Sequence, residues 1–298
     1  MHVEKSQFFA AEDTGRLDGP DNRLRLLFNK NLVRRLGCRS PVFASLQQEP
    51  MLKNLPFPLI VAHRGYSAQY PENTLVAFRA ADNAGAHMIE LDVNLTLDRR
   101  LVVIHDENVD RTTNGSGMVR RLTMEELRRL DAGSWFNARF EGERVPALSQ
   151  VLDAAKGRLK VNIEIKPEAF EARAQADAVE RQVLDLVHSK GMAADILVSS
   201  FEWQLLERLR SLEAGIALGL LSDVPADDSL LHWYQRVQGF SWHPDYRVLT
   251  PDQVKTLHDM GGRVFPYAVN GKIDVPGMLA MGADGVILDD PLQMPATA

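Results

Sequence analysis

Residues 88–95 read MIELDVNL and alternate between apolar and polar side chains. Successive side chains of a β-strand point to opposite faces, so an alternation of period two predicts a strand with one apolar and one polar face. The polar face carries two carboxylates, Glu90 and Asp92. Residues 161–166, which read VNIEIK, repeat the pattern with Glu164 and Lys166 on the polar face.

Predicted strands and helices alternate along most of the chain. Strands are expected at residues 59–62, 88–95, 101–104, 160–166, 196–199, 216–220, 239–242, 263–267 and 285–288. Helices are expected at residues 73–84, 148–155 and 170–189, and between most of the later strands. If the segments 88–95 and 101–104 count as one unit, eight strand–helix steps fit into residues 56–298.

This order predicts an α/β fold of the (β/α)8 TIM-barrel type, which typically takes about 250 residues. An open, doubly wound sheet is the alternative, but no glycine-rich dinucleotide-binding loop follows the first strand. The apolar strand faces of a parallel barrel pack outward against the helices. Glu90, Asp92 and Glu164 are therefore expected to point into the barrel interior.

Residues 106–147 fit no strand–helix unit. They contain the turn sequence Asn114-Gly115 and one clear helix, which opens with the capping box Thr123-x-x-Glu126. A connection of this length is more typical of an active-site insertion than of a plain loop. We predict a small insertion after the second β/α unit of a barrel domain that spans residues 56–298.

Residues 1–55 form an N-terminal extension. Residues 22–39 carry six Lys or Arg and no acid, which suggests a short helix docked on the barrel or at a subunit contact, or else lying on a membrane surface. The net charge of −6 leaves −12 for the remaining residues, which argues against a nucleic-acid partner. A homo-oligomer is compatible with this pattern.

The composition favours a cytoplasmic protein. One cysteine, Cys38, excludes an intrachain disulfide and is typical of a reducing compartment. The N-terminus lacks the apolar core of a signal peptide, and no run approaches the roughly 20 apolar residues of a transmembrane helix. We therefore expect no transmembrane segment.

His63 and His105 each stand where an apolar run ends, which is the position that barrel enzymes use for catalytic groups. The unperturbed pKa of histidine suits proton transfer near neutrality. A lone histidine at a strand end is more often a structural residue, but two of them flanking an acidic strand favour a general acid and a general base.

Glu90, Asp92 and Glu164 offer hard oxygen ligands, which Mg²⁺ or Ca²⁺ prefers, unless they form only the wet face of a half-exposed strand. Arg64 and Lys166 are expected to hold a negatively charged group such as a phosphate, to pair with the neighbouring acids, or both.

Trp135 in the insertion, with its neighbour Phe136, contributes either to a substrate platform or to a small core of the insertion itself.

Several motifs together resemble the glycerophosphodiester phosphodiesterase family. They are HRG at 63–65, PENT at 71–74, ELDV at 90–93, HDE at 105–107, DRTTNG at 110–115, DAGSWF at 131–136 and NIEIK at 162–166. The resemblance covers roughly residues 58–292. Two departures lie near the expected substrate end: YAVN begins at Tyr267 where the family often has Trp-Thr-Val-Asn, and LDDP at 288–291 replaces Thr-Asp-x-Pro.

The resemblance implies a TIM barrel that hydrolyses glycerophosphodiesters to sn-glycerol 3-phosphate and an alcohol. It implies a divalent metal on Glu90, Asp92 and Glu164, an acid/base pair of histidines, and phosphate contacts from Arg64 and Lys166. Tyr267 is expected near the substrate. The alternatives are a lysophospholipase D or phosphoinositide-type phospholipase that acts on a larger lipid, and a catalytically silent phosphodiester-binding barrel.

Overall fold

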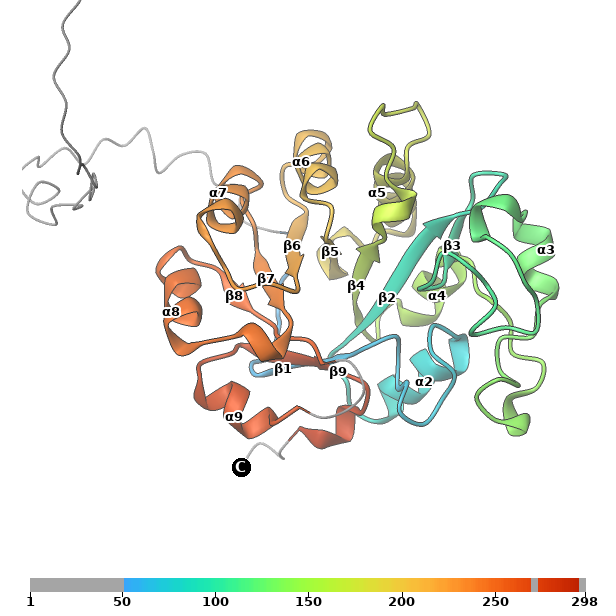
Figure 1. Ribbon diagram of the computed structural model, residues 1–298, viewed down its shortest axis with the longest axis horizontal. Coiled ribbons are helices and arrows are strands. Elements are labelled where there is room, and N and C mark those ends of the chain that lie inside the picture. Colours follow the sequence, from blue (N-terminus) through green and yellow to red (C-terminus); the bar gives the residue numbers. More distant parts are fainter. Residues whose placement is uncertain (1–50, 269–272, 295–298) are drawn as a thin grey trace, which may run out of the picture. The chain divides into compact units, whose positions relative to one another are not determined.

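The computed structural model describes residues 51–268 and 273–294 (Figure 1). The basic segment 22–39, Cys38 and residues 269–270 of the YAVN motif lie outside the described residues, so the expectations for residues 22–39 stay predictions. Met51 donates a backbone hydrogen bond to Gly215 at 2.8 Å, and the side chain of Leu52 is buried. The chain therefore contacts the barrel before its first strand begins.

The strands form a barrel. Within the described residues they are β1 (Leu59–Ala62), β2 (Met88–Leu95), β3 (Leu101–Val103), β4 (Lys160–Ile165), β5 (Ile196–Ser200), β6 (Ala217–Ser222), β7 (Ser241–Pro244), β8 (Arg263–Val264) and β9 (Gly285–Leu288). They follow the spatial order β8-β7-β6-β5-β4-β2-β1-β9, and all these neighbours are parallel. Off this path, β3 pairs with β2 and is antiparallel to it.

Backbone hydrogen bonds join the two ends of this order. Ile287 donates to the carbonyl of Pro266 at 2.9 Å, and Ala268 donates to the carbonyl of Ile287 at 3.1 Å. These bonds bring the segment after β8 against β9, which confirms the predicted TIM barrel.

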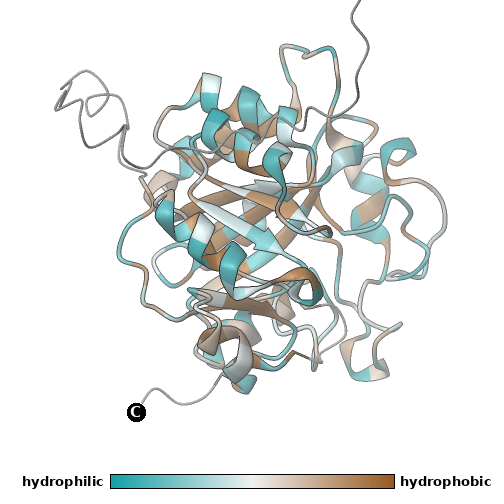
Figure 2. Cartoon of the chain, turned by 60° about the vertical axis from the view of Figure 1, so that its left-hand side comes forward, coloured by the Kyte–Doolittle hydropathy of each residue, from teal (hydrophilic) through white to brown (hydrophobic). Residues whose placement is uncertain are grey.

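Helices surround the strands (Figure 1). In the described part of the chain they are α2 (Leu75–Asn83), α3 (Met124–Arg129), α4 (Leu148–Ala155), α5 (Val179–Lys190), α6 (Trp203–Leu212), α7 (Asp228–Arg236), α8 (Pro251–Asp259) and α9 (Val275–Ala280). Hydrophilic and hydrophobic residues alternate along these helices in Figure 2. Their apolar sides pack on the outward strand residues, among them Ile89, Leu91 and Val93 of β2, all fully buried.

Helix α5 begins at Val179 rather than at Phe170, where the sequence predicted it. The backbone carbonyls of Glu171 and Ala172 accept hydrogen bonds from Arg208, and the Glu171 carboxylate pairs with Arg99. Because these bonds hold the start of the segment in a loop, it does not continue as helix.

The insertion lies between β3 and α4 and includes α3. It has a small apolar core of its own, made by residues such as Val109, Val119 and Leu127. The Asp131 carboxylate organises the next turn by accepting hydrogen bonds from three backbone N–H groups, those of Gly133, Ser134 and Gly142.

Among the described residues, no helix is both long and apolar enough to cross a membrane.

Candidate active site

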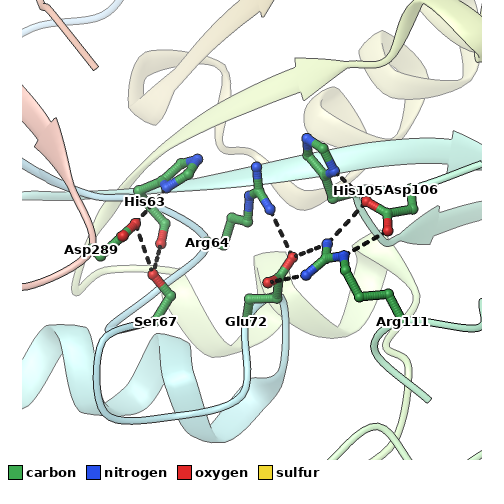
Figure 3. Close-up of a pocket in the computed structure, with 8 residues that line it drawn as sticks. All are labelled: His63, Arg64, Ser67, Glu72, His105, Asp106, Arg111 and Asp289. Carbon is green, nitrogen blue, oxygen red and sulfur yellow. Dashed lines mark hydrogen bonds and ion pairs between the residues drawn. The ribbon is translucent and has the colours of Figure 1, made fainter. Parts of the chain in front are cut away.

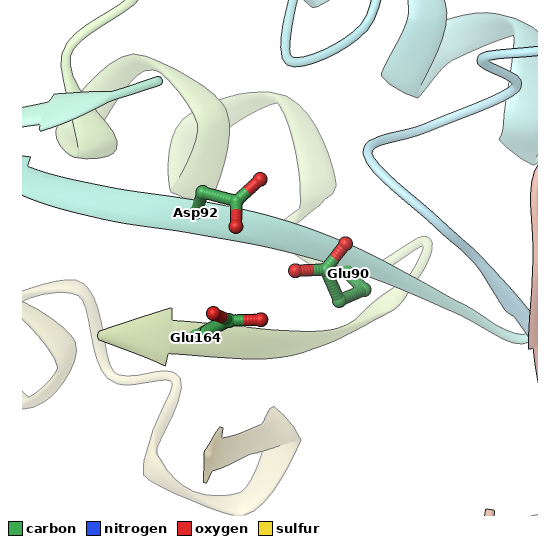
Figure 4. A group of neighbouring side chains, drawn as sticks. All are labelled: Glu90, Asp92 and Glu164. Carbon is green, nitrogen blue, oxygen red and sulfur yellow. The ribbon is translucent and has the colours of Figure 1, made fainter. Parts of the chain in front are cut away.

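Three buried carboxylates meet inside the barrel. Glu90 and Asp92 project from β2 and Glu164 from β4 (Figure 4). The register of the two strands places Asp92 beside Glu164, and each of the three acids offers an oxygen within 4.8 Å of the others. Burial, together with the charges of Asp92 and Glu164, raises the pKa of Glu90 well above its usual value. One Glu90 oxygen, Oε1, is buried without a hydrogen-bond partner in the described part of the chain.

Asp92 is held by Asn73, which precedes α2. Nδ2 of Asn73 donates to Oδ2 of Asp92 at 2.7 Å, while Oδ1 of Asn73 accepts from the Asp92 backbone at 3.3 Å. Asn73 has a φ of +57°, a conformation that Asn tolerates better than most residues. The next residue, Thr74, is the N-cap of α2. Asn73 thus belongs to the site rather than to the cap.

Arg64 and Lys166 face these acids. Lys166 Nζ lies 2.6 Å from Glu164 Oε1 and 3.4 Å from Asp92 Oδ1, and Arg64 Nε lies 3.3 Å from Asp92 Oδ2. The Arg64 backbone donates to Glu90 Oε2 at 2.9 Å. Burial by itself would raise the pKa of Asp92, but the charges of Arg64 and Lys166 outweigh it and hold that pKa far below its usual range.

His63 lies at the carboxyl end of β1 and is held from one side. Its Nδ1 is 2.7 Å from Oδ1 of Asp289, which follows β9 (Figure 3). Ser67 lies within hydrogen-bond distance of both, with its Oγ 2.8 Å from the His63 carbonyl and 3.2 Å from Asp289 Oδ1. Burial would raise the pKa of Asp289, but the hydrogen bond to His63 holds it below its usual value.

His105 follows β3 and has the same arrangement. Its Nδ1 is 2.6 Å from Oδ1 of Asp106. Asp106 in turn accepts two hydrogen bonds from Arg111, and these, ahead of the His105 contact, lower the pKa of Asp106 to about 2. Both histidines therefore have Nδ1 engaged by a carboxylate, and neither Nε2 has a hydrogen-bond partner among the described residues.

Two cavities share His63, Arg64 and His105. One, of about 390 Å³, is polar and is drawn in Figure 3 with all its lining residues. The other, of about 170 Å³, contains Glu90, Glu164 and Lys166 on one side. Its remaining wall is largely apolar and is formed by Asn162, Phe201, Leu221, Tyr267 and Ile287.

The structure thus brings eight of the predicted site residues to one pair of cavities or to the acid cluster beside them: His63, Arg64, Glu90, Asp92, His105, Glu164, Lys166 and Tyr267. Trp135 lines neither cavity. It is 38% exposed, packs edge-on against Phe136 and donates from Nε1 to the Ala132 carbonyl. Its role as a substrate platform stays a prediction.

Sequence reasoning missed several polar residues of the site. Glu72, Asp106, Arg111 and Asp289 line the larger cavity, although no role was predicted for them. The signal was present, because each stands inside a motif already recognised. What was missing was the knowledge of which side chains they contact.

Residues 63–293 match the model of the glycerophosphoryl diester phosphodiesterase family. The chain belongs to this family. It is 38% identical over 234 residues to a glycerophosphodiester phosphodiesterase of Caldanaerobacter subterraneus subsp. tengcongensis, and the alignment covers 78% of this chain and 94% of that protein.

Solved structures of glycerophosphoryl diester phosphodiesterases and related enzymes share the fold. An Oleispira antarctica phosphodiesterase in complex with the product sn-glycerol-3-phosphate superposes with a TM-score of 0.72 at 26% identity, covering 80% of this chain and 95% of that one. A glycerophosphodiester phosphodiesterase from Agrobacterium tumefaciens gives 0.66 at 32% identity, covering 78% and 97%.

Proposed function

We propose that this family member hydrolyses glycerophosphodiesters to sn-glycerol 3-phosphate and an alcohol, with His63 and His105 as the acid/base pair. The observation that carries the proposal is that both histidines line the same two cavities and that each has its Nδ1 held by a carboxylate. The names of the relatives, and the product bound to the Oleispira antarctica enzyme, fit this substrate class.

The carboxylates decide which ring nitrogen reacts. A carboxylate only accepts hydrogen bonds, so Asp289 and Asp106 keep the proton of each neutral ring on Nδ1. Nε2 then carries the lone pair and can accept a proton. A protonated ring can donate from the same atom, and the carboxylate stabilises the positive charge that forms.

The acid cluster fits a divalent cation. When all three acids are ionised, Arg64 and Lys166 balance two of the charges and leave one net negative charge. A divalent ion held by Glu90, Asp92 and Glu164 would offset this negative charge and would attract a phosphodiester monoanion. The unpartnered Oε1 of Glu90 is free to act as a ligand. Bound there, Mg²⁺ or Ca²⁺ supplies charge stabilisation for the phosphoryl oxygens.

The substrate brings its own nucleophile. The glycerol 2-hydroxyl lies one carbon from the phosphoester oxygen and therefore has a high effective concentration. One histidine takes the proton of that hydroxyl as its oxygen bonds to phosphorus. The other donates a proton to the alcohol oxygen as the bond from phosphorus to that oxygen breaks. Water then opens the five-membered cyclic phosphate while the histidines exchange roles, and Lys166 and Arg64 hold the phosphoryl oxygens.

The test is a turnover assay on glycerophosphocholine with His63→Ala and His105→Ala, with His258→Ala as control. His258 lies on α8 and pairs with Asp284, and it lines neither cavity. In each active-site variant kcat should fall by at least about 100-fold, while the unfolding temperature stays that of wild type. The control should keep its activity. An analogue without the 2-hydroxyl should bind but turn over far more slowly.

Wild-type kcat in a folded His105→Ala variant would rule out the acid/base pair. Equal turnover of the deoxy analogue, with no cyclic phosphate in rapid-quench samples, would instead favour direct attack by water. Absence of turnover on every glycerophosphodiester, together with activity on lysophosphatidylcholine, would point to the lipid-directed alternative.

A further inference from the structure

A continuous chain of hydrogen bonds, most of them between charged groups, links the insertion to the barrel (Figure 3). It starts at the His105 ring and runs through Asp106, Arg111 and Glu72 to Arg64. Arg111 is the centre of this chain. Its Nε and Nη2 donate to the two oxygens of Asp106 at 2.7 and 2.9 Å, and its Nη1 and Nη2 donate to the two oxygens of Glu72 at 2.8 Å each.

We propose that Arg111 is a positioning residue for catalysis: it clamps Asp106, and through Asp106 it fixes the orientation and tautomer of His105. The proposal rests on the acid/base role of His105. Because Arg111 belongs to the insertion (residues 106–147), the proposal gives the insertion a part in orienting the catalytic histidine.

The hydrogen-bond geometry favours positioning over substrate binding. A guanidinium has five N–H donors, and four donor contacts of Arg111 are already made to the two carboxylates. Little donor capacity is left for a phosphate, even though the side chain is 43% exposed at the cavity wall. Arg111 is therefore committed to protein groups before any substrate arrives.

Arg111 is also the residue that lets Asp106 serve His105. The Asp106 side chain is 29% exposed, so without a second partner it could turn to solvent. The bidentate contact restricts both of its oxygens at once, and Oδ1 is the atom that faces His105 Nδ1. At the other end of the chain, Arg64 Nη1 donates to Glu72 Oε1 at 2.8 Å, so Glu72 and Arg111 are held by a residue of the barrel.

The experiment compares Arg111→Ala, Asp106→Asn and the double variant in steady-state kinetics. Arg111→Ala should lower kcat about 10- to 100-fold, as is usual for the loss of a group that orients a metal-binding side chain. It should change KM by less than about threefold. Because Arg111 acts through Asp106, adding Arg111→Ala to Asp106→Asn should cost less than about threefold more. Guanidinium ion in the buffer should restore part of the lost kcat in Arg111→Ala.

Two further variants separate positioning from folding. Arg128→Ala is the matched control. Arg128 also belongs to the insertion, but among the described residues its side chain donates a hydrogen bond only to Gln150, and it lines neither cavity. This variant should behave as wild type. Arg111→Lys keeps the charge but cannot make bidentate hydrogen bonds to both carboxylates. It should therefore fold, with a kcat between those of wild type and Arg111→Ala. It carries the test if Arg111→Ala does not fold.

Three outcomes would overturn the proposal. They are an unchanged kcat in both Arg111 variants, a raised KM with wild-type kcat, and full additivity of Arg111→Ala with Asp106→Asn. If His105→Ala itself were silent, the acid/base assignment would fail instead, so the two ideas are tested separately.

Discussion

Asp289 offers a sharp test of how the structure prepares His63. Its Oδ1 lies 2.7 Å from His63 Nδ1, and both side chains are largely buried, with 18% and 14% exposed. Asp289→Asn keeps the size of the side chain and an oxygen that can accept the same hydrogen bond, but removes the charge. Asp289→Ala removes the acceptor as well.

The expected losses follow from the strength of this one contact. A hydrogen bond to a charged group contributes about 1.5–3 kcal/mol and a neutral one about 0.5–1.5 kcal/mol. Asp289→Asn should therefore weaken the support of the imidazolium by about 1.4 kcal/mol, which is about tenfold in kcat. Asp289→Ala forfeits the whole contact of about 3 kcal/mol and should cost about 100-fold.

The assay is release of sn-glycerol 3-phosphate, with thermal unfolding measured in parallel. Asp290→Asn serves as control, because Asp290 is the next residue but lines neither cavity and accepts from the Leu292 backbone. If both Asp289 variants stay within threefold of wild type while His63→Ala loses 100-fold, His63 does not depend on Asp289.

Two further predictions concern the metal and pH. Exhaustive chelation should abolish activity and lower the unfolding temperature, and Mg²⁺ or Ca²⁺ should restore both in wild type but not in Glu90→Gln; full activity with no metal found by elemental analysis would refute the assignment. Burial lowers the pKa of His243 from 6.5 to about 3. Between these two pH values the unfolded chain binds a proton at this residue and the folded chain does not. The free energy of unfolding therefore falls as the pH drops from 6.5 towards 3. Between pH 7 and pH 4 the loss in the free energy of unfolding amounts to about 3 kcal/mol. In urea unfolding measured over this pH range, His243→Gln should therefore lose less stability than wild type. An equal loss of stability in the two proteins would contradict the prediction.

The barrel could be predicted because local pattern and global fold agree. The period-two alternation of residues 88–95 requires a strand with two different environments, and a parallel barrel supplies them, with helices outside and the polar interior at the strand ends. The start of α5 could not be predicted, because the segment 170–178 reads as helical by composition. Its loop depends on Arg99 and Arg208, which approach from elsewhere in the sequence.

The residues of the acid cluster were predictable for the same reason that the barrel was. Once β2 and β4 are neighbours, parity alone turns Glu90, Asp92 and Glu164 inward. Whether a position in a strand is odd or even does not, however, say which side chains contact one another.

Asp289 reaches His63 across 226 positions of sequence, and Arg111 reaches Glu72 across 39. Each of these pairs depends on where a loop returns after its strand, which periodicity does not encode. The strand ends therefore specify which groups can react, while the loops specify how those groups are held. The positioning residues should accordingly be sought in the loops, where the sequence signal is a motif without an evident contact.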